Sequence, residues 1–198
     1  MGIAHRETTD IALDRPARSA PATPTTYRID PAASRIEFSI NKRRFFVQHL
    51  VVTGRFTDVS GTITLDQAHP AGAQAVVTIG AASIDTGNRQ RDKHLRTADF
   101  FHVDRHPSLT FQSRQVEAID QAAGRYRVVG DLAVRGVTRP VTLDARYEPA
   151  EGTGPGRRIK LTLTGSLNRR DFGIVWDNPL FHVADDLTVK LEVEAIAE

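Results

Sequence analysis

The chain has 198 residues, of which 40% are hydrophobic and 25% are charged, and its formal net charge at pH 7 is +2. This composition is typical of a soluble domain, and the charge is too small to indicate nucleic-acid binding. The absence of cysteine excludes disulfides, thiolate catalysis and cysteine-ligated zinc, and no apolar run approaches the roughly 18–20 residues that span a bilayer.

The N-terminal segment differs in composition from the rest of the chain. Residues 1–26 are rich in Pro, Ala and Thr, carry mixed charge and show no hydrophobic periodicity. This predicts a disordered tail, followed by one folded domain over residues 27–196. The segment also lacks the continuous apolar stretch of a secretory signal, so we expect a cytoplasmic protein.

From Tyr27 onward, apolar and polar residues alternate, which is typical of antiparallel strands with one buried face. Phe45–Phe56 is less regular, and its Gly54 suggests a bulge or bend. Counting this stretch, we expect about eight strands. The clearest alternation covers residues 36–40, 59–65, 75–81, 109–111, 126–134, 141–147, 159–167 and 187–195.

No helical pattern separates successive strands, which argues against a parallel, doubly wound sheet. Eight antiparallel strands form either a sandwich or a closed barrel, and closure removes the exposed edges. The interior of such a barrel is either filled by side chains or holds one small ligand. Small residues at inward positions leave free volume if they cluster, or they mark bends of the sheet, and both interpretations are open here. These residues are Gly61, Ala75, Ala81, Gly130, Ala145 and Gly165.

One polar passage, residues 81–101, interrupts the strands. Thr86-Gly87-Asn88 predicts a turn, with Asn88 as the N-cap of a short helix. Leu95 and the closing Phe100-Phe101 offer apolar surface toward the strands. The passage is therefore interpreted either as a plug that completes the core or as a lid over a ligand mouth, with His94 and basic residues facing a polar head group.

Catalytic motifs are absent from the sequence. His102 and His106 are four residues apart, but Pro107 disfavours a helix at this point and no third ligand is near, so no metal site is expected. An enzyme would have to use an acid or base from among His49, His94 and Asp171.

A second dense segment, "LNRRDFGIVWDNP" over residues 167–179, follows a predicted strand and holds the only tryptophan. Arg169 and Asp171 are close enough in sequence to pair. We interpret the segment either as a corner whose polar groups satisfy backbone donors and acceptors, or as a site of direct ligand contact.

Several segments together resemble the YceI family of lipocalin-like proteins. The resemblance runs in order over about residues 27–196, and six motifs in one order are specific. They are "YRIDPAASRIEFSI" (27–40), "GRFTDVSGTITLD" (54–66), "ASIDTGNRQRDKHLRTADFF" (82–101), "HPSLTFQS" (106–113), "GDLAVRGVTRPVTL" (130–143) and "LNRRDFGIVW" (167–176).

The resemblance implies an all-β fold, an eight-stranded antiparallel lipocalin-like barrel with a short helical insertion closing one end. It implies that the interior binds an isoprenoid lipid or a quinone-like molecule with a long tail, with no catalytic machinery and no other cofactor. Family members can be dimers, so a homodimer is a possible partner state. Many members carry a secretory signal; the polar N-terminus here keeps the expectation cytoplasmic.

Three functions compete at this point. The first is binding, storage or transport of a long isoprenoid lipid, since each buried CH2 contributes roughly 0.8 kcal/mol. The second is an enzyme modifying such a lipid, and the third is a stress-response interaction module with a solid barrel. For the first function, the predicted tail-binding residues are Phe38, Ile63, Val77, Ile79, Leu95, Phe100, Phe111, Val128, Leu163 and Leu191. The predicted head-group residues are Arg89, Arg91, His94 and Arg169.

Overall fold

Most of the described part of the chain is β-sheet. The structure, a computed structural model, describes residues 24–44, 48–149, 154–178 and 181–198. Its one α-helix is α1 (Arg89–Leu95), and no helix of the described residues is long and apolar enough to cross a membrane. The strands are β1 (Thr25–Ile29), β2 (Arg35–Arg44), β3 (Gln48–Phe56), β4 (Val59–Leu65), β5 (Gln74–Gly80), β6 (Ile84–Asp85), β7 (Ser108–Asp120), β8 (Arg125–Val134), β9 (Val137–Glu148), β10 (Arg158–Asn168) and β11 (Phe181–Ala197).

The sheet closes on itself. Its strands follow the order β1-β4-β5-β7-β8-β9-β10-β11, and β11 returns to β1 through pairs such as Ile29 with Ala195. Every pairing is antiparallel. The prediction of a closed eight-stranded antiparallel barrel is therefore confirmed.

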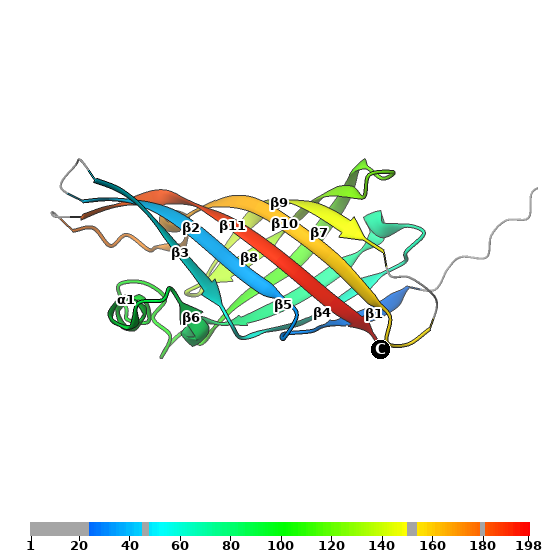
Figure 1. Ribbon diagram of the computed structural model, residues 1–198, viewed down its shortest axis with the longest axis horizontal. Helices are drawn as coiled ribbons and strands as arrows, with labels where there is room; N and C mark the ends of the chain where they lie inside the picture. The colour runs from blue at the N-terminus through cyan, green and yellow to red at the C-terminus, as the bar shows by residue number, and fades with distance from the viewer. Residues whose placement is uncertain (1–23, 45–47, 150–153, 179–180) are drawn as a thin grey trace, which may run out of the picture.

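Three of the eight barrel strands are interrupted. β1 and β2 lie end to end along β11, because β1 pairs with residues 195–197 of β11 and β2 pairs with residues 181–192. The second interrupted strand consists of β4, which pairs with β1, and β3, which pairs with β2. The third consists of β5, which pairs with β4, and β6, which pairs with β3. The result is an elongated barrel, with α1 beside one end (Figure 1).

Of the bulge or bend expected at Gly54, the bulge is wrong, and the bend stays a prediction. The β2–β3 ladder runs without a register shift over its whole described length. Gly54 is required for another reason, since a Cβ there would collide with the ring of Phe38 on the neighbouring strand. The register shifts lie instead in β11, between Val183 and Leu187, and in β7.

The glycines of the barrel mark close packing and leave no free volume of their own. A Cβ on Gly130 would lie 2.5 Å from the ring of Phe111, and one on Gly165 would lie 2.6 Å from Leu143. Neighbouring large side chains therefore cover both glycines. This favours the interpretation that they let the sheet curl.

Several strands are longer than the alternation predicted. The last strand covers Phe181–Ala197, and the strand expected near 109–111 covers Ser108–Asp120. β1 begins at Thr25, two residues before the expected start of the domain. The predicted disordered tail lies, for residues 1–23, outside the described residues.

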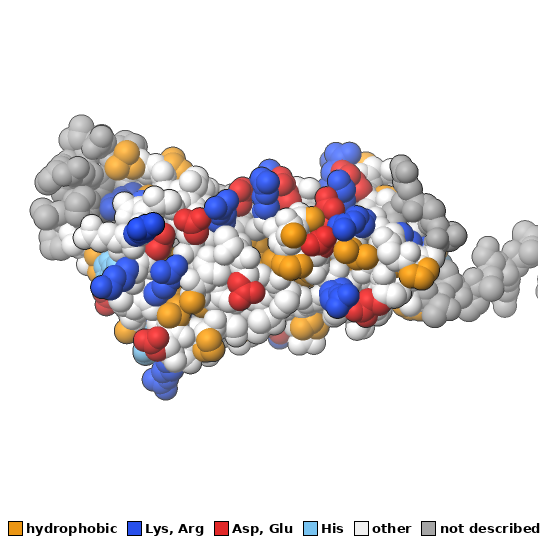
Figure 2. Space-filling view, turned by 60° about the horizontal axis from the view of Figure 1, so that its bottom comes forward, with side chains coloured by type: hydrophobic (Ala, Val, Ile, Leu, Met, Phe, Trp, Pro, Cys, Tyr) orange, Lys and Arg blue, Asp and Glu red, His pale blue; other side chains and the backbone are white. Residues whose placement is uncertain are grey.

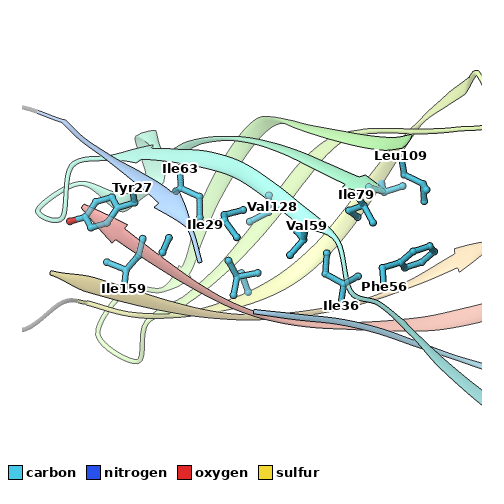
Figure 3. Close-up of a cluster of buried hydrophobic side chains, with 14 of the residues drawn as sticks. Tyr27, Ile29, Ile36, Phe56, Val59, Ile63, Ile79, Leu109, Val128 and Ile159 are labelled. Carbon is cyan, nitrogen blue, oxygen red and sulfur yellow. The ribbon is translucent and has the colours of Figure 1, made fainter. Parts of the chain in front are cut away.

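The barrel end opposite α1 is closed by packed side chains, and we call it the tyrosine end. Tyr27 and Ile159 are fully buried, and Tyr126 and Tyr147 are also buried. Gln67 Nε2 donates a hydrogen bond of 2.8 Å to the Tyr27 hydroxyl. Figure 3 shows the buried side chains of Tyr27, Ile159 and their neighbours projecting from the strands into the space between them.

Candidate ligand-binding cavity

The barrel encloses a cavity of about 360 Å³. This volume falls within the range of about 300–1,000 Å³ that is usual for small-molecule sites. All eight barrel strands contribute apolar side chains to the wall. The wall extends from Tyr147 at the tyrosine end to His94 and Trp176 beside α1. The barrel is therefore hollow, which argues against a solid interior.

All ten predicted tail-binding residues line this cavity. The alternation placed the eight strand residues correctly on the inner face, because a strand in a closed barrel has one face in the interior. Leu95 and Phe100 come from the α1 passage. That they contact a ligand stays a prediction. They are Phe38, Ile63, Val77, Ile79, Leu95, Phe100, Phe111, Val128, Leu163 and Leu191.

The passage that carries α1 begins as its sequence predicts. The side chain of Asn88 caps the helix by accepting a hydrogen bond from the backbone N–H of Arg91, at 3.0 Å. Asp92 is buried and accepts a second bond, also of 3.0 Å, from the backbone N–H of Thr86. These bonds fix the rotation of the helix, so that Arg91 and Leu95 both reach the cavity wall.

Three rings close the wall at the α1 end. The centroid of the His94 ring lies 5.1 Å from Phe100 and 5.3 Å from Trp176, and Phe100 and Trp176 are 5.4 Å apart. Asp99 orients the imidazole, with Oδ2 lying 2.8 Å from Nε2. We call His94, Phe100 and Trp176 the aromatic cluster; it joins the α1 passage to the connection between β10 and β11. The passage thus supplies both core packing and cavity wall, which supports the plug interpretation. That it acts as a lid over a ligand stays a prediction.

Arg91 brings a positive charge to this wall. Its Nε donates to Thr86 Oγ1 at 2.7 Å and its Nη2 donates to Thr86 O at 2.8 Å. Both acceptors are neutral, and no described carboxylate forms an ion pair with this guanidinium. Arg91 is therefore a half-buried cation that Thr86 holds in place, and Thr86 Oγ1 in turn donates to the buried carboxylate of Asp92.

Arg169 lines the cavity, and its guanidinium is held by the surrounding chain. Its side chain is only 4% exposed, and it forms ion pairs with Asp177 and Asp185, not with Asp171 as the sequence suggested. Its donors are all occupied, which supports the interpretation of this segment as a satisfied corner. The backbone acceptors are the carbonyls of Ile174, Trp176, Val183 and Ala184, at 2.9–3.2 Å.

The neighbouring Arg170 reinforces the same corner from the surface. It donates to Asp185 at 2.7 Å and to Asp177 at 2.8 Å. The Arg170 guanidinium accordingly holds the pKa of Asp177 below its usual value. The two adjacent arginines share two carboxylates, and the corner holds Trp176 at the cavity wall.

The remaining predicted residues either do not line the cavity or have side chains outside the described residues. Arg89 is exposed in the first turn of α1, and Asp171 is exposed; neither lines the cavity. The side chain of His49 lies outside the described residues. His102 and His106 form a ring contact with centroids 5.8 Å apart, and no group of three metal-ligating side chains occurs among the described residues.

The sequence analysis named only part of the cavity wall, and two of the wall residues that it did not name bear on the polar end. Lys42 lines the cavity at the α1 end, and so does Trp176. Lys42 continues the spacing of Phe38 and Ile40 by two residues, so the alternation did contain this signal. Trp176 lies outside any strand, and its position depends on the contacts of Arg169, which no periodicity reports.

Comparison with known proteins places this barrel among described relatives. The model of the YceI-like domain matches residues 27–195. A UPF0312 protein of Serratia proteamaculans is 37% identical over 157 residues, covering 77% of this chain and 79% of that protein. Protein YceI of Shigella flexneri is 35% identical over 159 residues, covering 78% and 80%.

Solved structures have the same fold. The YceI protein of Campylobacter jejuni matches with a TM-score of 0.69 at 31% identity, covering 77% of this chain and 88% of that one. A domain from Saccharophagus degradans, described as a polyisoprenoid binding domain, matches with a TM-score of 0.62 at 18% identity, covering 88% and 99%. At that identity the second likeness shows the fold alone.

Proposed function

Because this chain belongs to the YceI-like domain family, we propose that it binds one long apolar molecule, an isoprenoid lipid or a quinone-like amphiphile, inside its barrel. It would serve as a carrier or a store of that molecule. The observation that carries this proposal is the cavity of about 360 Å³, whose wall is almost wholly apolar.

Water fills a cavity with so apolar a wall poorly, because it finds few hydrogen-bond partners there. A long apolar chain suits it better, since each buried CH2 contributes roughly 0.8 kcal/mol. Binding therefore explains why the interior is hollow.

The cavity wall also suggests how the molecule lies. The tyrosine end is packed and apolar within, and it suits the end of a hydrocarbon tail. The α1 end holds Arg91 and His94, and a polar head group needs such partners because its unpaired burial costs several kcal/mol. We place the head beside Arg91 and His94. We exclude Arg89 because it does not line the cavity, and Arg169 because its donors are all occupied.

The fold likeness to a polyisoprenoid binding domain supports the ligand class. No observation favours catalysis over binding. His94 is held by Asp99 and by two aromatic rings, and these contacts make it part of the cavity wall. We therefore propose no second function.

Adjacent valines on β5 offer a matched test. Val77 lines the cavity, whereas Val76 is 50% exposed on the outer face. Val77→Trp fills the cavity and is expected to weaken binding of geranylgeraniol at least tenfold, while Val76→Trp leaves binding unchanged. Equal affinities for the two variants would contradict the proposal. So would native mass spectrometry that finds no lipid with the wild-type protein, either as purified or after incubation with the prenol.

The head assignment has its own matched pair on α1. Arg91→Gln is expected to weaken binding of geranylgeranyl phosphate by about 5- to 100-fold, the range for losing a charge-assisted partner, and to spare geranylgeraniol. Arg89→Gln, two residues away and exposed, is the control. If Arg91→Gln weakens both ligands equally, the head group lies elsewhere while the tail assignment stands.

A further inference from the structure

Exposed apolar side chains gather at the α1 end of the barrel. Leu50 and Val51 on β3 are 43% and 65% exposed, and Val175, in the connection between β10 and β11, is 57% exposed. We call these three residues the mouth rim. Large apolar side chains in water are unremarkable singly, but three at one end of a barrel indicate a contact surface. Leu50 and Val51 are consecutive in β3, so they lie on opposite faces of this strand.

Contacts within the barrel place the mouth rim beside the cavity wall at the α1 end. Leu50 pairs with Lys42 on β2, and Lys42 pairs with Val183 on β11. Arg169 then joins Val183 to Trp176, because it donates to both carbonyls, and Trp176 is next to Val175 in the chain. Both Lys42 and Trp176 line the cavity. The mouth rim therefore borders the part of the wall that holds the polar groups.

The α1 end also carries a net positive charge. The described segments at this end, residues 40–44, 48–50, 86–107, 135–139, 168–178 and 181–186, contain twelve Lys and Arg and seven Asp, a net charge of +5. The whole chain has a net charge of only +2, so the remaining residues carry −3. Figure 2 shows Lys and Arg side chains beside hydrophobic ones at this end, on the left of the view.

From the mouth rim and this charge asymmetry we propose that the α1 end docks on an anionic lipid bilayer. The rim side chains enter the apolar boundary of the lipid headgroups, and the basic side chains, among them exposed Arg89 and Lys93, lie against the negative surface. The inference rests on the proposed function in one respect: a ligand too apolar for water must pass directly between a bilayer and the cavity. Docking places the cavity opening against the lipid from which the ligand comes.

Vesicle flotation tests the proposal directly. Wild-type protein is expected to float with vesicles of phosphatidylcholine that contain phosphatidylglycerol, and to bind pure phosphatidylcholine much more weakly. Changing the mouth rim with Leu50→Ser, Val51→Ser and Val175→Ser is expected to weaken this binding at least tenfold. The control is Val76→Ser with Ile119→Ser, which removes similar exposed side chains from other parts of the barrel.

Charge is tested with a second pair of variants. Arg89→Gln with Lys93→Gln is expected to weaken binding to the anionic vesicles about ten- to thirtyfold, at about a factor of five per cation, and the loss should vanish at high salt. Arg125→Gln with Arg146→Gln removes two exposed cations that face each other on β8 and β9 near the tyrosine end, and it should have little effect.

Three results would overturn the docking surface. Wild-type protein could fail to float with anionic vesicles, or the rim variant and its control could float equally. The rim variant could instead change only the oligomeric state in light scattering, which would assign the surface to a second copy paired along the open edge of β3. Val77→Trp should still float, so loss of ligand binding and loss of docking are separate outcomes.

Discussion

The two ends of the barrel are closed by different kinds of interaction. At the tyrosine end, Tyr27 and Ile159 are fully buried, and β1, β4, β10 and β11 enclose them through continuous strand pairing. At the α1 end, the wall consists of a short helix, an aromatic cluster and a corner held by arginines. The half-buried His94 and Trp176 mark that end as the one in contact with water.

Because of this difference, we expect one end to determine the stability of the fold and the other to determine ligand access to the cavity. A hydrophobic seal gains its energy from buried area and opens only when strands separate. The α1 end is closed by side-chain hydrogen bonds and ring contacts between segments that connect strands. These segments can move apart while the strands stay paired, because connecting segments have lower local stability than core strands. We therefore expect the tyrosine end to govern unfolding and the α1 end to govern ligand entry.

The largest effect is expected at the tyrosine end. Tyr27→Ala removes a fully buried ring and its hydrogen bond from Gln67, and it should lower the free energy of unfolding by roughly 3–5 kcal/mol. Val175→Ala at the mouth rim should change it by less than about 0.5 kcal/mol. Urea denaturation of both variants measures the contrast, and similar losses would show that the two ends contribute equally to stability.

The corner at the α1 end should come next. Arg169→Gln leaves buried carbonyls and two carboxylates without their donor, and a loss of about 2–3 kcal/mol is expected. Arg170→Gln, at the adjacent exposed position, should cost about 1 kcal/mol or less. If thermal unfolding ranks the two variants equally, then the corner is held by its surface ion pairs and not by the buried guanidinium.

Alkaline pH should act through the tyrosine end. Burial raises the pKa of Tyr147 to about 12, from an ordinary value near 10, and burial also raises the pKa of Tyr126. The unfolded chain therefore loses these protons first. The contribution of Tyr147 to stability is present below pH 10 and is lost as the pH rises toward 12, by at most about 1.4 kcal/mol per pH unit. Urea titrations at pH 9, 10 and 11 measure this slope.

The barrel could be predicted from the sequence because apolar and polar residues alternate periodically along its strands. Inward and outward residues alternate along every strand, so the wall residues Val77, Phe111 and Leu163 could be predicted from spacing alone. The helix start at Asn88 was also predictable, because an N-cap is a local signal. Periodicity even pointed to Lys42, through its spacing from Phe38 and Ile40.

What could not be predicted depends on contacts between distant segments. The role of Arg169 is set by carbonyls of residues 174–184, which reach it only when the connection folds back on β11. Gly54 suggested a bulge, yet its conformation is determined by the ring of Phe38 across the ladder. The interruptions that divide three barrel strands were equally invisible, because each half alternates normally.

The smallest expected effect concerns a single hydroxyl. The Tyr147 side chain is buried, and its hydroxyl has no hydrogen-bond partner, although Arg157 is near enough to act on its pKa. A buried polar group without a partner costs energy, so Tyr147→Phe should leave stability at pH 7 unchanged or raise it by up to about 1 kcal/mol. The same variant should flatten the alkaline slope, since its ring cannot ionise, and Tyr126 alone would then account for what remains. Urea denaturation at pH 7 and pH 11 tests both statements. If Tyr147→Phe loses more than about 1 kcal/mol at pH 7, the hydroxyl has a partner in solution, and the tyrosine end depends on a polar contact as the α1 end does.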